Sequence, residues 1–523
     1  MSVYEELLQK LAPYGQEHLL SFWEELSDEE RDSLRQQIDV IDFDLLKDLF
    51  VHRSDPSAAA ELAYRAEEPS TAYKLSDLRD YDCSKNSPYP QSDAMKLDET
   101  TNSITPLKAV SVGEKYLREG KIAVVVVAGG QGTRLGFPYA KGLFQIGPHS
   151  HATLFQIHVE RILAMQRKYG VRLPFCIQTS PVTHQEIIDF FKENNNFGLH
   201  PDDVLVFCQD TMPSVDFDSG KVLLADKAKI ARNPNGHGGM LEAINSPQHD
   251  SSLSIAREKG VLAELKSRGI EELFYFQIDN PLVDICNPEF IGYHVLNKSD
   301  YTLQAIRKND PKDRVGNIVM IDGRLYIIEY SDLPDEVGAR RKSDGTLEIW
   351  AGSIAVHMMN VEFLQKNASY SSSLPFHFAK KKVKHVVFDK EAKGENGEPL
   401  YGTVIDPDSP NATKYEKFIF DLLPLANNPI VVEIDKETGF APLKNRSGEK
   451  NDTPETVQKH LTGLSSRWLS HLGIKVPDEK SIEISPLFAN SCTELADRLK
   501  KLEMFPADGI IKESAYWSED SVK

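Results

Sequence analysis

The feature that most constrains the fold of this chain is the run IAVVVV, Ile122 to Val127, which passes directly into the glycine loop Gly129-Gly130-Gln131-Gly132. Uninterrupted β-branched residues are typical of a strand that is buried on both faces of a parallel sheet. Ligands of such sheets bind at the carboxyl ends of the strands. The run therefore predicts a parallel sheet with a ligand site where this strand ends.

Helix-like and strand-like segments alternate after the loop, which indicates βαβ units with right-handed crossovers. We expect strands in PFCIQTS, VLVFCQ and LFYFQIDN, and helices near residues 153–169, 184–194 and 253–267. Short turns separate YTLQAIRK, NIVMID, RLYIIEYS and LEIWAGSIAVHM, so these segments predict an antiparallel extension of the sheet. A helix is expected near 415–426. The predicted fold class is α/β, with a Rossmann-like mixed sheet.

The pattern changes at two places along the chain, which predict three regions. Apolar residues recur with helical spacing up to about residue 55, and the stretch from 55 to 105 is rich in Ser, Pro, Asp and Tyr without sustained periodicity. We expect a helical N-terminal segment and connection over 1–104, a central domain over 105–427 and a small C-terminal lobe over 428–523.

Charge and composition exclude several classes of protein. The net charge of −19, from 60 basic and 79 acidic residues, opposes a general role on nucleic acid or on an anionic membrane. The N-terminus lacks a signal-peptide pattern, and the longest apolar run is far shorter than the ~20 residues of a spanning helix. The five cysteines are scattered without metal-type spacing, which is typical of reduced thiols. We therefore expect a cytoplasmic protein that holds any anionic ligand in a local basic cluster.

Arg134 and Lys141 flank the glycine loop in VVAGGQGTRLGFPYAKG, Val126 to Gly142. Glycines let backbone N–H groups approach a phosphate, and the two cations add positive charge. The spacing matches neither common fingerprint, because Gly136 comes one position late for a Rossmann loop and Lys141 follows Ala140 rather than a P-loop glycine. A plain strand-to-helix turn with surface charges is the alternative, but two cations around one loop favour a phosphate site.

This loop resembles the signature of uridylyltransferases of the UDP-sugar pyrophosphorylase superfamily, and five further motifs are similar to those of eukaryotic-type UDP-N-acetylglucosamine pyrophosphorylases. They follow one another collinearly within roughly residues 13–450: GQEHLLSFWEEL, IDNPLVDICNPEFIGYH, RVGNIVMIDGRLYIIEYSDL, YEKFIFD and FAPLKN. The resemblance implies a nucleotidyltransferase core of the GT-A-like type, with catalysis in 105–427. It also implies UTP and a sugar 1-phosphate as substrates and Mg²⁺ as cofactor.

The resemblance further assigns roles to single residues. Mg²⁺ and three catalytic cations, Arg134, Lys141 and Lys414, would neutralise the charge of the phosphates. By this resemblance the UTP phosphates would be held by Gly129, Gly130, Arg134 and Lys141, the uridine by Gln209 and Gly236, the magnesium by Asp279, the sugar by Gly316, Glu329 and Lys444, and the sugar phosphate by Lys414.

The residues themselves support these roles unevenly. Asp279 ends the apolar segment LFYFQID, where a carboxylate is costly unless it coordinates something. Capping of the turn at Asn280-Pro281 is the alternative for this carboxylate. Glu329 alone would be a surface strand residue, and Lys414 and Lys444 alone would be solvated lysines. Only the resemblance makes these three residues candidates.

Three positions depart from the pattern of the acetylglucosamine enzymes. His237 in PNGHGGM and Ser353 in WAGSIAVH stand where Asn is usual, and Gly-His-Gly is typical of the UDP-glucose branch. Both side chains would lie near the sugar, so they bear on which sugar is used; His237 as a structural turn histidine is the alternative. Ala140 replaces a common Pro and leaves the catalytic lysine in place.

The sequence therefore predicts a uridylyltransferase that forms UDP-N-acetylglucosamine and pyrophosphate, with the same reaction on glucose or galactose 1-phosphate as the alternative. A nicotinamide oxidoreductase would need an acidic residue about 20 positions beyond the loop, in a region that instead carries Lys168 and Arg172. An inactive sugar-nucleotide-binding regulator would be expected to have lost phosphate contacts, and none of the matched positions is lost.

Overall fold

The computed structural model describes residues 1–53, 62–69, 72–75, 104–248, 251, 253–369, 374–394 and 396–520. The chain divides into two compact units, each assembled from segments that are distant in sequence. Unit 1 comprises residues 1–58, 209–240 and 371–421, and unit 2 comprises residues 59–208, 241–370 and 422–523. The boundaries expected after residues 104 and 427 stay a prediction.

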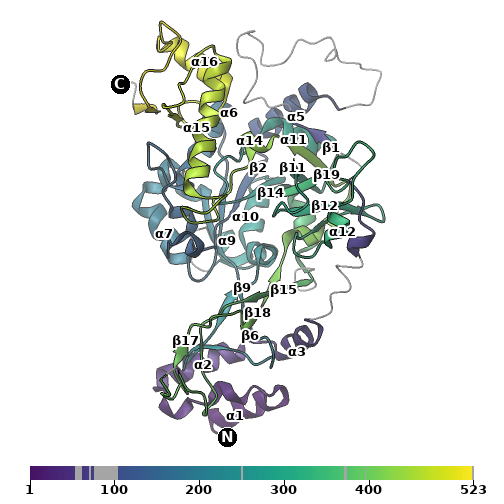
Figure 1. Ribbon diagram of the computed structural model, residues 1–523, viewed down its shortest axis with the longest axis vertical. Coiled ribbons are helices and arrows are strands. Elements are labelled where there is room, and N and C mark those ends of the chain that lie inside the picture. Colours follow the sequence, from purple (N-terminus) through teal and green to yellow (C-terminus); the bar gives the residue numbers. More distant parts are fainter. Residues whose placement is uncertain are drawn as a thin grey trace. The chain divides into compact units, whose positions relative to one another are not determined.

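Unit 2 is built around a large mixed sheet (Figure 1). Its parallel half follows the predicted βαβ pattern, and β14 runs antiparallel to both of its neighbours, β10 and β11. This architecture confirms the α/β fold class. The strands lie in the order β1 (Ala72–Lys74), β19 (Ile430–Ile434), β11 (Tyr301–Arg307), β14 (Ala351–Asn360), β10 (Glu272–Gln277), β2 (Ile122–Val127), β3 (Phe175–Thr179) and β4 (Val204–Cys208).

The antiparallel extension expected between residues 300 and 400 is present beside β14. Strands β12 (Gly316–Ile321) and β13 (Arg324–Ile328) form a hairpin whose turn contains Asp322 and Gly323, both with positive φ. The first residues of β12 pair with the start of β14. The hairpin thus branches from the sheet at the end where β10 stops, because β14 and β10 are antiparallel.

Helices pack with the sheet into an apolar core that includes Ile122, Val124 and Val126 of β2. Helices α5 and α11 approach each other at Gly113 and Gly292, where an added Cβ would fall within 2 Å of a backbone oxygen of the other helix. Gly260, with φ of 90°, divides the single helix expected over 253–267. The helices of unit 2 include α5 (Pro106–Arg118), α6 (Leu154–Tyr169), α7 (His184–Glu193), α9 (Ser254–Lys259), α10 (Val261–Ser267), α11 (Pro288–Leu296), α12 (Asp335–Gly338), α13 (Val361–Lys366), α14 (Lys436–Gly439), α15 (Pro454–His471) and α16 (Cys492–Lys501), and α8 (Met240–Asn245) starts at the unit boundary.

Unit 1 contains the helical N-terminal segment predicted from the sequence. Ser2 and Ser27 form capping boxes that begin the first two helices, and the apolar faces of these helices join one core. Its elements include α1 (Val3–Leu11), α2 (Asp28–Asp39), α3 (Phe43–His52), β5 (Thr211–Pro213), β6 (Val215–Asp216), β7 (Leu224–Asp226), β8 (Lys229–Ile230), β9 (Arg232–Pro234), β15 (Phe376–Lys381), β16 (His385–Val386), β17 (Val404–Ile405) and β18 (Ala412–Lys417).

The helix expected near 415–426 is confirmed only in its later part, because its first residues belong to a strand. Residues Ala412–Lys417 form strand β18, which pairs with β15 along its whole length, and Ile419–Leu425 is a 3₁₀ helix interrupted by Pro424. The apolar spacing of YEKFIFD is compatible with a helical turn, but cross-strand pairing with β15 outweighs this local preference. The physical cause is therefore a tertiary partner that lies more than 30 residues earlier in the chain.

The C-terminal residues form a second apolar cluster of unit 2, which contains β20 (Ile482–Ile484), β21 (Ala515–Trp517) and the buried faces of α15 and α16. Strand β19, in contrast, lies inside the large sheet between β1 and β11. The free-thiol expectation is met at Cys176 and Cys286, which are buried, whereas Cys492 is disulfide-bonded, so the expectation is wrong there. Cys83 lies outside the described residues.

Candidate functional site

The glycine loop begins where β2 ends, and its two leading glycines have different surroundings. A Cβ at Gly129 would lie 3.0 Å from the Ser180 nitrogen, and the Ser180 hydroxyl donates to the Gly129 carbonyl at 2.7 Å. At Gly130 an added Cβ would have no atom within 4 Å. The base of the loop is therefore packed against the end of β3, while the side of Gly130 where a Cβ would stand is open space.

Lys141 lies on the far side of the loop, in a short 3₁₀ turn, and its backbone N–H donates to the Gly130 carbonyl at 3.0 Å. Its ammonium lies 3.7 Å from Asp279 Oδ2 and donates to the Leu443 carbonyl at 3.3 Å. The side chain is only 16% exposed. Burial lowers the pKa of Lys141, Asp279 opposes that change, and Arg134 lowers it further. This buried cation is held next to a loop with open backbone groups.

Asp279 follows β10, on the same sheet edge as the glycine loop, because β10 and β2 are parallel neighbours. Its carbonyl accepts the Leu443 N–H at 2.8 Å. The neighbouring Asn280 caps the turn: its side-chain oxygen accepts the N–H groups of Leu282 and Ala441. The turn-cap role considered for Asp279 is thus performed by Asn280, and the Asp279 carboxylate faces Lys141.

Asp452 joins this group although no sequence motif singled it out. Its carbonyl accepts the N–H groups of Lys444 and Asn445, so the two chain segments are held together. Burial raises the pKa of the Asp452 carboxyl, Lys444 lowers it and Asp279 raises it. Its φ of 59° is uncommon for a residue other than Gly, a conformation that is often found at functional sites. We call Arg134, Lys141, Asp279, Lys444 and Asp452 the glycine-loop cluster.

The structure also brings together three residues that the motifs placed at the sugar. Gly316 at the start of β12 pairs with Ser353 on β14, and a Cβ on Gly316 would lie 3.4 Å from Glu329 Oε1. Glu329 directly follows β13. We call these residues the three-strand cluster. It lies at the edge where β10 ends, because β14 is antiparallel to β10 and Ser353 is near the start of β14.

Unit 1 carries the remaining predicted residues. Gly236 has φ of 80°, and a Cβ there would lie 2.4 Å from the Lys417 carbonyl oxygen, so no other residue fits. His237 stacks on Phe418 with ring centroids 5.0 Å apart, and its Nδ1 accepts the Ile419 N–H at 3.2 Å. Burial lowers the pKa of His237 to about 3, and His377 contributes in the same direction. The ring is therefore neutral, with its proton on Nε2.

Lys414 lies on β18 opposite Ala379 of β15. Burial lowers the pKa of its ammonium, Glu416 opposes that change and Lys381 adds to it. A partly desolvated cation beside a second lysine is a favourable partner for a phosphate dianion. Gln209 is 5% exposed and directly follows β4. Unit 1 thus supplies a buried amide, a fixed histidine and a partly buried cation.

The replacement of a common Pro by Ala140 has a structural consequence. The Ala140 N–H donates to Glu186 Oε2 at 2.7 Å, a bond that proline cannot make because it has no N–H. Glu186 lies in the first turn of α7. This chain therefore ties the residue before Lys141 to a helix, which supplies a restraint on the loop that sequence reasoning did not predict.

A cofactor site was expected at Asp279. No group of three or more His, Cys, Asp or Glu side chains that could hold a metal exists among the described residues. Magnesium commonly binds one or two carboxylates and completes its shell with water and substrate phosphates. Asp279, which raises the pKa of the Asp452 carboxyl, fits that pattern. The donors present therefore suit Mg²⁺ that arrives with a nucleotide and do not suit a metal held by protein alone.

The sequence matches the UDPGP family, described as UTP–glucose-1-phosphate uridylyltransferase, over residues 83–474. The chain belongs to this family. This membership confirms the resemblance found in the motifs and the uridylyltransferase class of enzyme. A "UDP-N-acetylhexosamine pyrophosphorylase-like protein 1" from Xenopus tropicalis is 33% identical, over 89% of this chain and 84% of its own. The "UDP-N-acetylglucosamine pyrophosphorylase" of Saccharomyces cerevisiae is 30% identical, over 95% of this chain and 98% of its own.

Solved structures of named pyrophosphorylases share this fold. The uridine diphosphate N-acetylglucosamine pyrophosphorylase from Trypanosoma brucei, solved with an inhibitor, superposes with a TM-score of 0.75 at 24% identity. The match covers 100% of this chain and 99% of that chain. Among the described residues of this UDPGP member, no helix is long and apolar enough to cross a bilayer.

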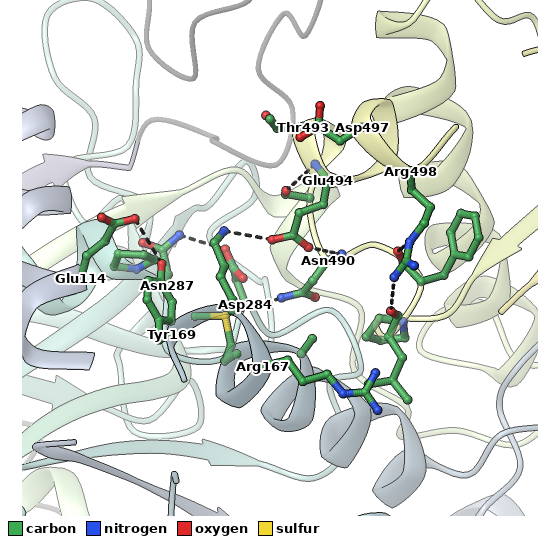
Figure 2. A pocket seen from close by; sticks show the side chains of 18 of the residues that line it. Glu114, Arg167, Tyr169, Asp284, Asn287, Asn490, Thr493, Glu494, Asp497 and Arg498 are labelled. Atoms are coloured by element: carbon green, nitrogen blue, oxygen red, sulfur yellow. Dashed lines mark hydrogen bonds and ion pairs between the residues drawn. The ribbon is translucent and has the colours of Figure 1, made fainter. Parts of the chain in front are cut away.

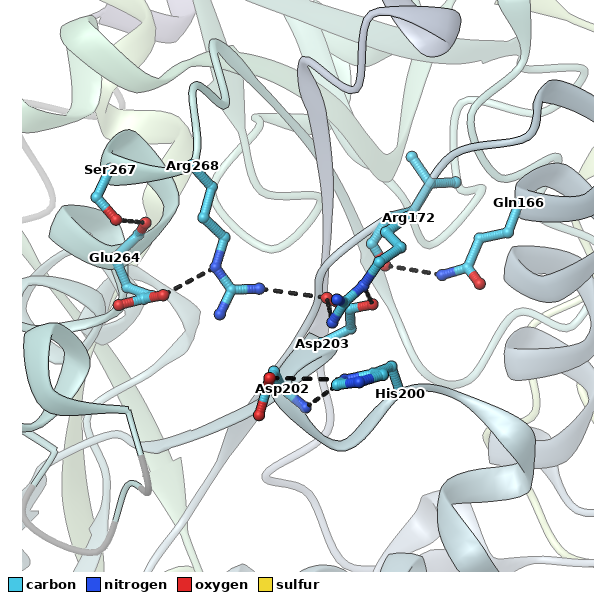
Figure 3. Close-up of polar contacts among 9 residues, drawn as sticks. Gln166, Arg172, His200, Asp202, Asp203, Glu264, Ser267 and Arg268 are labelled. Atoms are coloured by element: carbon cyan, nitrogen blue, oxygen red, sulfur yellow. Dashed lines mark hydrogen bonds and ion pairs between the residues drawn. The ribbon is translucent and has the colours of Figure 1, made fainter.

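Two residues weighed against an oxidoreductase have structural partners in unit 2. Arg172 binds Asp203 with two hydrogen bonds of 2.6 and 2.9 Å, and Arg268 contacts the same carboxylate (Figure 3). Lys168 pairs with Glu494, which lines a groove at the start of α16 (Figure 2). None of the predicted site residues lines this groove, so the groove and the family's predicted site are separate features.

Proposed function

We propose that this protein transfers the uridylyl group of UTP to N-acetylglucosamine 1-phosphate, giving UDP-N-acetylglucosamine and pyrophosphate. The observation that carries the proposal is the position of Lys141. Its buried ammonium lies 3.7 Å from the Asp279 carboxylate, and its backbone N–H donates to the Gly130 carbonyl. This arrangement matches an anionic ligand that brings its own cation. Relatives that are named UDP-N-acetylglucosamine pyrophosphorylase or diphosphorylase support N-acetylglucosamine as the sugar.

The reaction needs charge neutralisation more than proton transfer. The attacking oxygen belongs to an ionised phosphate, so no general base is required when it displaces pyrophosphate from the α-phosphorus. Lys141 and Arg134 would stabilise charge on the UTP phosphates, and Lys414 would bind the sugar phosphate. Because Lys141 is desolvated before substrate arrives, its interaction with a phosphate oxygen is stronger than that of a surface lysine.

Asp279 would hold Mg²⁺, with Asp452 as the second carboxylate nearby. The bound ion supplies charge neutralisation at the phosphate oxygens. With the ion present, Asp279 would have two cationic partners, since its carboxylate already faces Lys141. We propose that the protein binds UTP and a sugar 1-phosphate. We propose no binding to nucleic acid or to a membrane. We also propose a cytoplasmic location, which cell fractionation would test.

The second candidate is the same reaction with glucose 1-phosphate or galactose 1-phosphate. His237 favours it, because its Nδ1 accepts a backbone N–H and its Nε2–H is therefore a fixed donor. Asn in the same place would offer both a donor and an acceptor to an acetamido group. In His237→Asn combined with Ser353→Asn, the ratio of kcat/KM for the acetylated sugar to kcat/KM for the plain sugar should rise. The rise should correspond to about 1–3 kcal/mol of discrimination.

A substrate panel tests the proposal directly. Purified protein is incubated with UTP, Mg²⁺ and one of three sugar 1-phosphates, and pyrophosphate release is followed, with NAD(P)H absorbance as the control. The highest kcat/KM is expected with N-acetylglucosamine 1-phosphate. A preference for glucose 1-phosphate would replace the first candidate by the second. Absence of pyrophosphate with every sugar would contradict both.

A further inference from the structure

Lys308 is a buried lysine outside the motifs that predicted the site. It directly follows β11, its backbone N–H donates to the Trp350 carbonyl at 2.8 Å, and the residue is only 3% exposed. Burying an ammonium is costly unless it makes good hydrogen bonds. Among the lysines that the structure describes, Lys308 is the least exposed. Such a residue calls for an explanation in terms of what its head group holds.

The contacts of Lys308 connect it with the β12–β13 hairpin and with β14. Its stem packs on Gly352, where an added Cβ would lie 3.3 Å from Lys308 Cγ. Its ammonium donates to Asn317 Oδ1. The Asn317 side-chain nitrogen then donates to the Ile328 carbonyl at 3.2 Å, and Asn317 is 1% exposed. One lysine and one amide therefore join β11, β12, β13 and β14.

The three residues contacted in this way are each adjacent in sequence to a residue of the three-strand cluster. Gly352 precedes Ser353, Asn317 follows Gly316 and Ile328 precedes Glu329. Resting on the proposed function, we infer that Lys308 is a positioning residue that sets the spacing of the three-strand cluster and thereby the fit of the sugar 1-phosphate. It would act through Asn317 and would not touch substrate itself.

The bond from Lys308 does not depend on its charge. Burial lowers the pKa of Lys308 to about 8, and Asp313 opposes that change. A neutral amine keeps two N–H groups, so donation to Asn317 persists above that pH. What matters is therefore the donor and the length of the stem. Methionine keeps a similar stem and removes the donor, whereas arginine keeps a donor.

The test measures KM for each substrate separately in the full-length enzyme. Lys308→Met should raise KM for the sugar 1-phosphate about tenfold and change KM for UTP by less than about twofold. A tenfold change is the lower end of the range expected when a group that orients a binding residue is lost. Asn317→Leu should give a similar change, and the double variant should lose no more than the larger single loss, since both remove the same bond. Lys308→Arg should recover part of the loss. Lys312→Met, an exposed lysine between β11 and β12, is the matched control.

The possible outcomes separate this inference from the function on which it rests. Unchanged KM values, equal increases for both substrates, or additive losses in the double variant would overturn the positioning role while the wild-type enzyme still makes UDP-sugar. If Lys308→Met does not fold, Lys308→Arg and Asn317→Leu decide by the same KM split. A wild-type protein inactive on every sugar 1-phosphate would overturn the proposed function and this inference together.

Discussion

The glycine-loop cluster and the three-strand cluster lie on the same sheet but are built differently. The first consists of charged side chains from the segments that follow β2, β10 and α14, with Lys141 and Asp279 at its centre. The second consists of a glycine, a serine and a glutamate whose places are set by strand pairing, as in the pair of Gly316 with Ser353. The difference matches the expected ligands. Phosphates need charge, whereas a sugar needs hydrogen-bonding groups at defined spacing.

The comparison predicts different failures for the two clusters. Loss of charge should lower turnover whatever the sugar, because the phosphates are common to all substrates. Loss of spacing should affect recognition of the sugar 1-phosphate and leave UTP unaffected. The experiments below are ordered by the size of the effect we expect, and each one can separate the two clusters or show that they act as one.

Lys141→Ala should have the largest effect. Lys141 would stand where negative charge develops on the phosphates in the transition state. Removal of one such preorganised charge lowers kcat by about 10²–10³-fold. Steady-state rates with saturating UTP and two different sugar 1-phosphates measure this loss, which should be equal for both sugars. Lys192→Ala, an exposed lysine on α7, is the control. A loss confined to one sugar would show that Lys141 belongs to sugar recognition.

Asp279→Asn should come next. The amide keeps the shape of the side chain but removes the charge that attracts Mg²⁺, so the Mg²⁺ concentration for half-maximal rate should rise about 10–100-fold. A Mg²⁺ titration at saturating UTP measures this change, with the melting temperature recorded in EDTA to show that the fold survives. Asp189→Asn on α7 is the matched control. Superimposable titration curves would place the metal elsewhere.

Gly316→Ala tests the three-strand cluster. The new Cβ would lie 2.7 Å from Ile327 Cγ2 and 3.4 Å from Glu329 Oε1, so the Ile327 side chain or the neighbouring backbone must shift. We expect KM for the sugar 1-phosphate to rise about tenfold, KM for UTP to stay constant, and stability to fall by about 1–3 kcal/mol. Gly463→Ala, at a site in α15 where a Cβ meets nothing, is the control. Parallel rises in both KM values would join the two clusters.

The smallest effect concerns acid stability near the glycine-loop cluster. His158 is fully buried and bonds the Ile278 carbonyl at 3.2 Å, and burial lowers its pKa to about 3 from an ordinary 6.5. Between these values the unfolded chain binds the extra proton, so stability falls as pH falls from 6.5 towards 3. His158→Gln should therefore lose about 2 kcal/mol less than wild type between pH 7 and pH 5. Equal losses of melting temperature in the two proteins would contradict the prediction.

The sequence predicted the parallel half of the sheet closely because its signals are local. The run at β2 and the apolar segments of β3, β4 and β10 lie where expected. The last residues of β18 were predicted as the start of a helix, since their partner β15 is remote in sequence. Asp452 was missed for the same reason, because the Asp279 carboxylate that raises its pKa is remote in sequence.

By itself, then, the sequence determined the fold class, the family and the chemical kind of each candidate residue, because runs, loops and motifs are contiguous. Tertiary structure alone decided that Lys141 is desolvated against Asp279, that Asn280 caps the turn, and that Gly316, Glu329 and Ser353 meet. It also decided that Lys308 is buried beneath them. Burial and strand register depend on residues far apart in the chain, and those partners meet only when the sheet has formed.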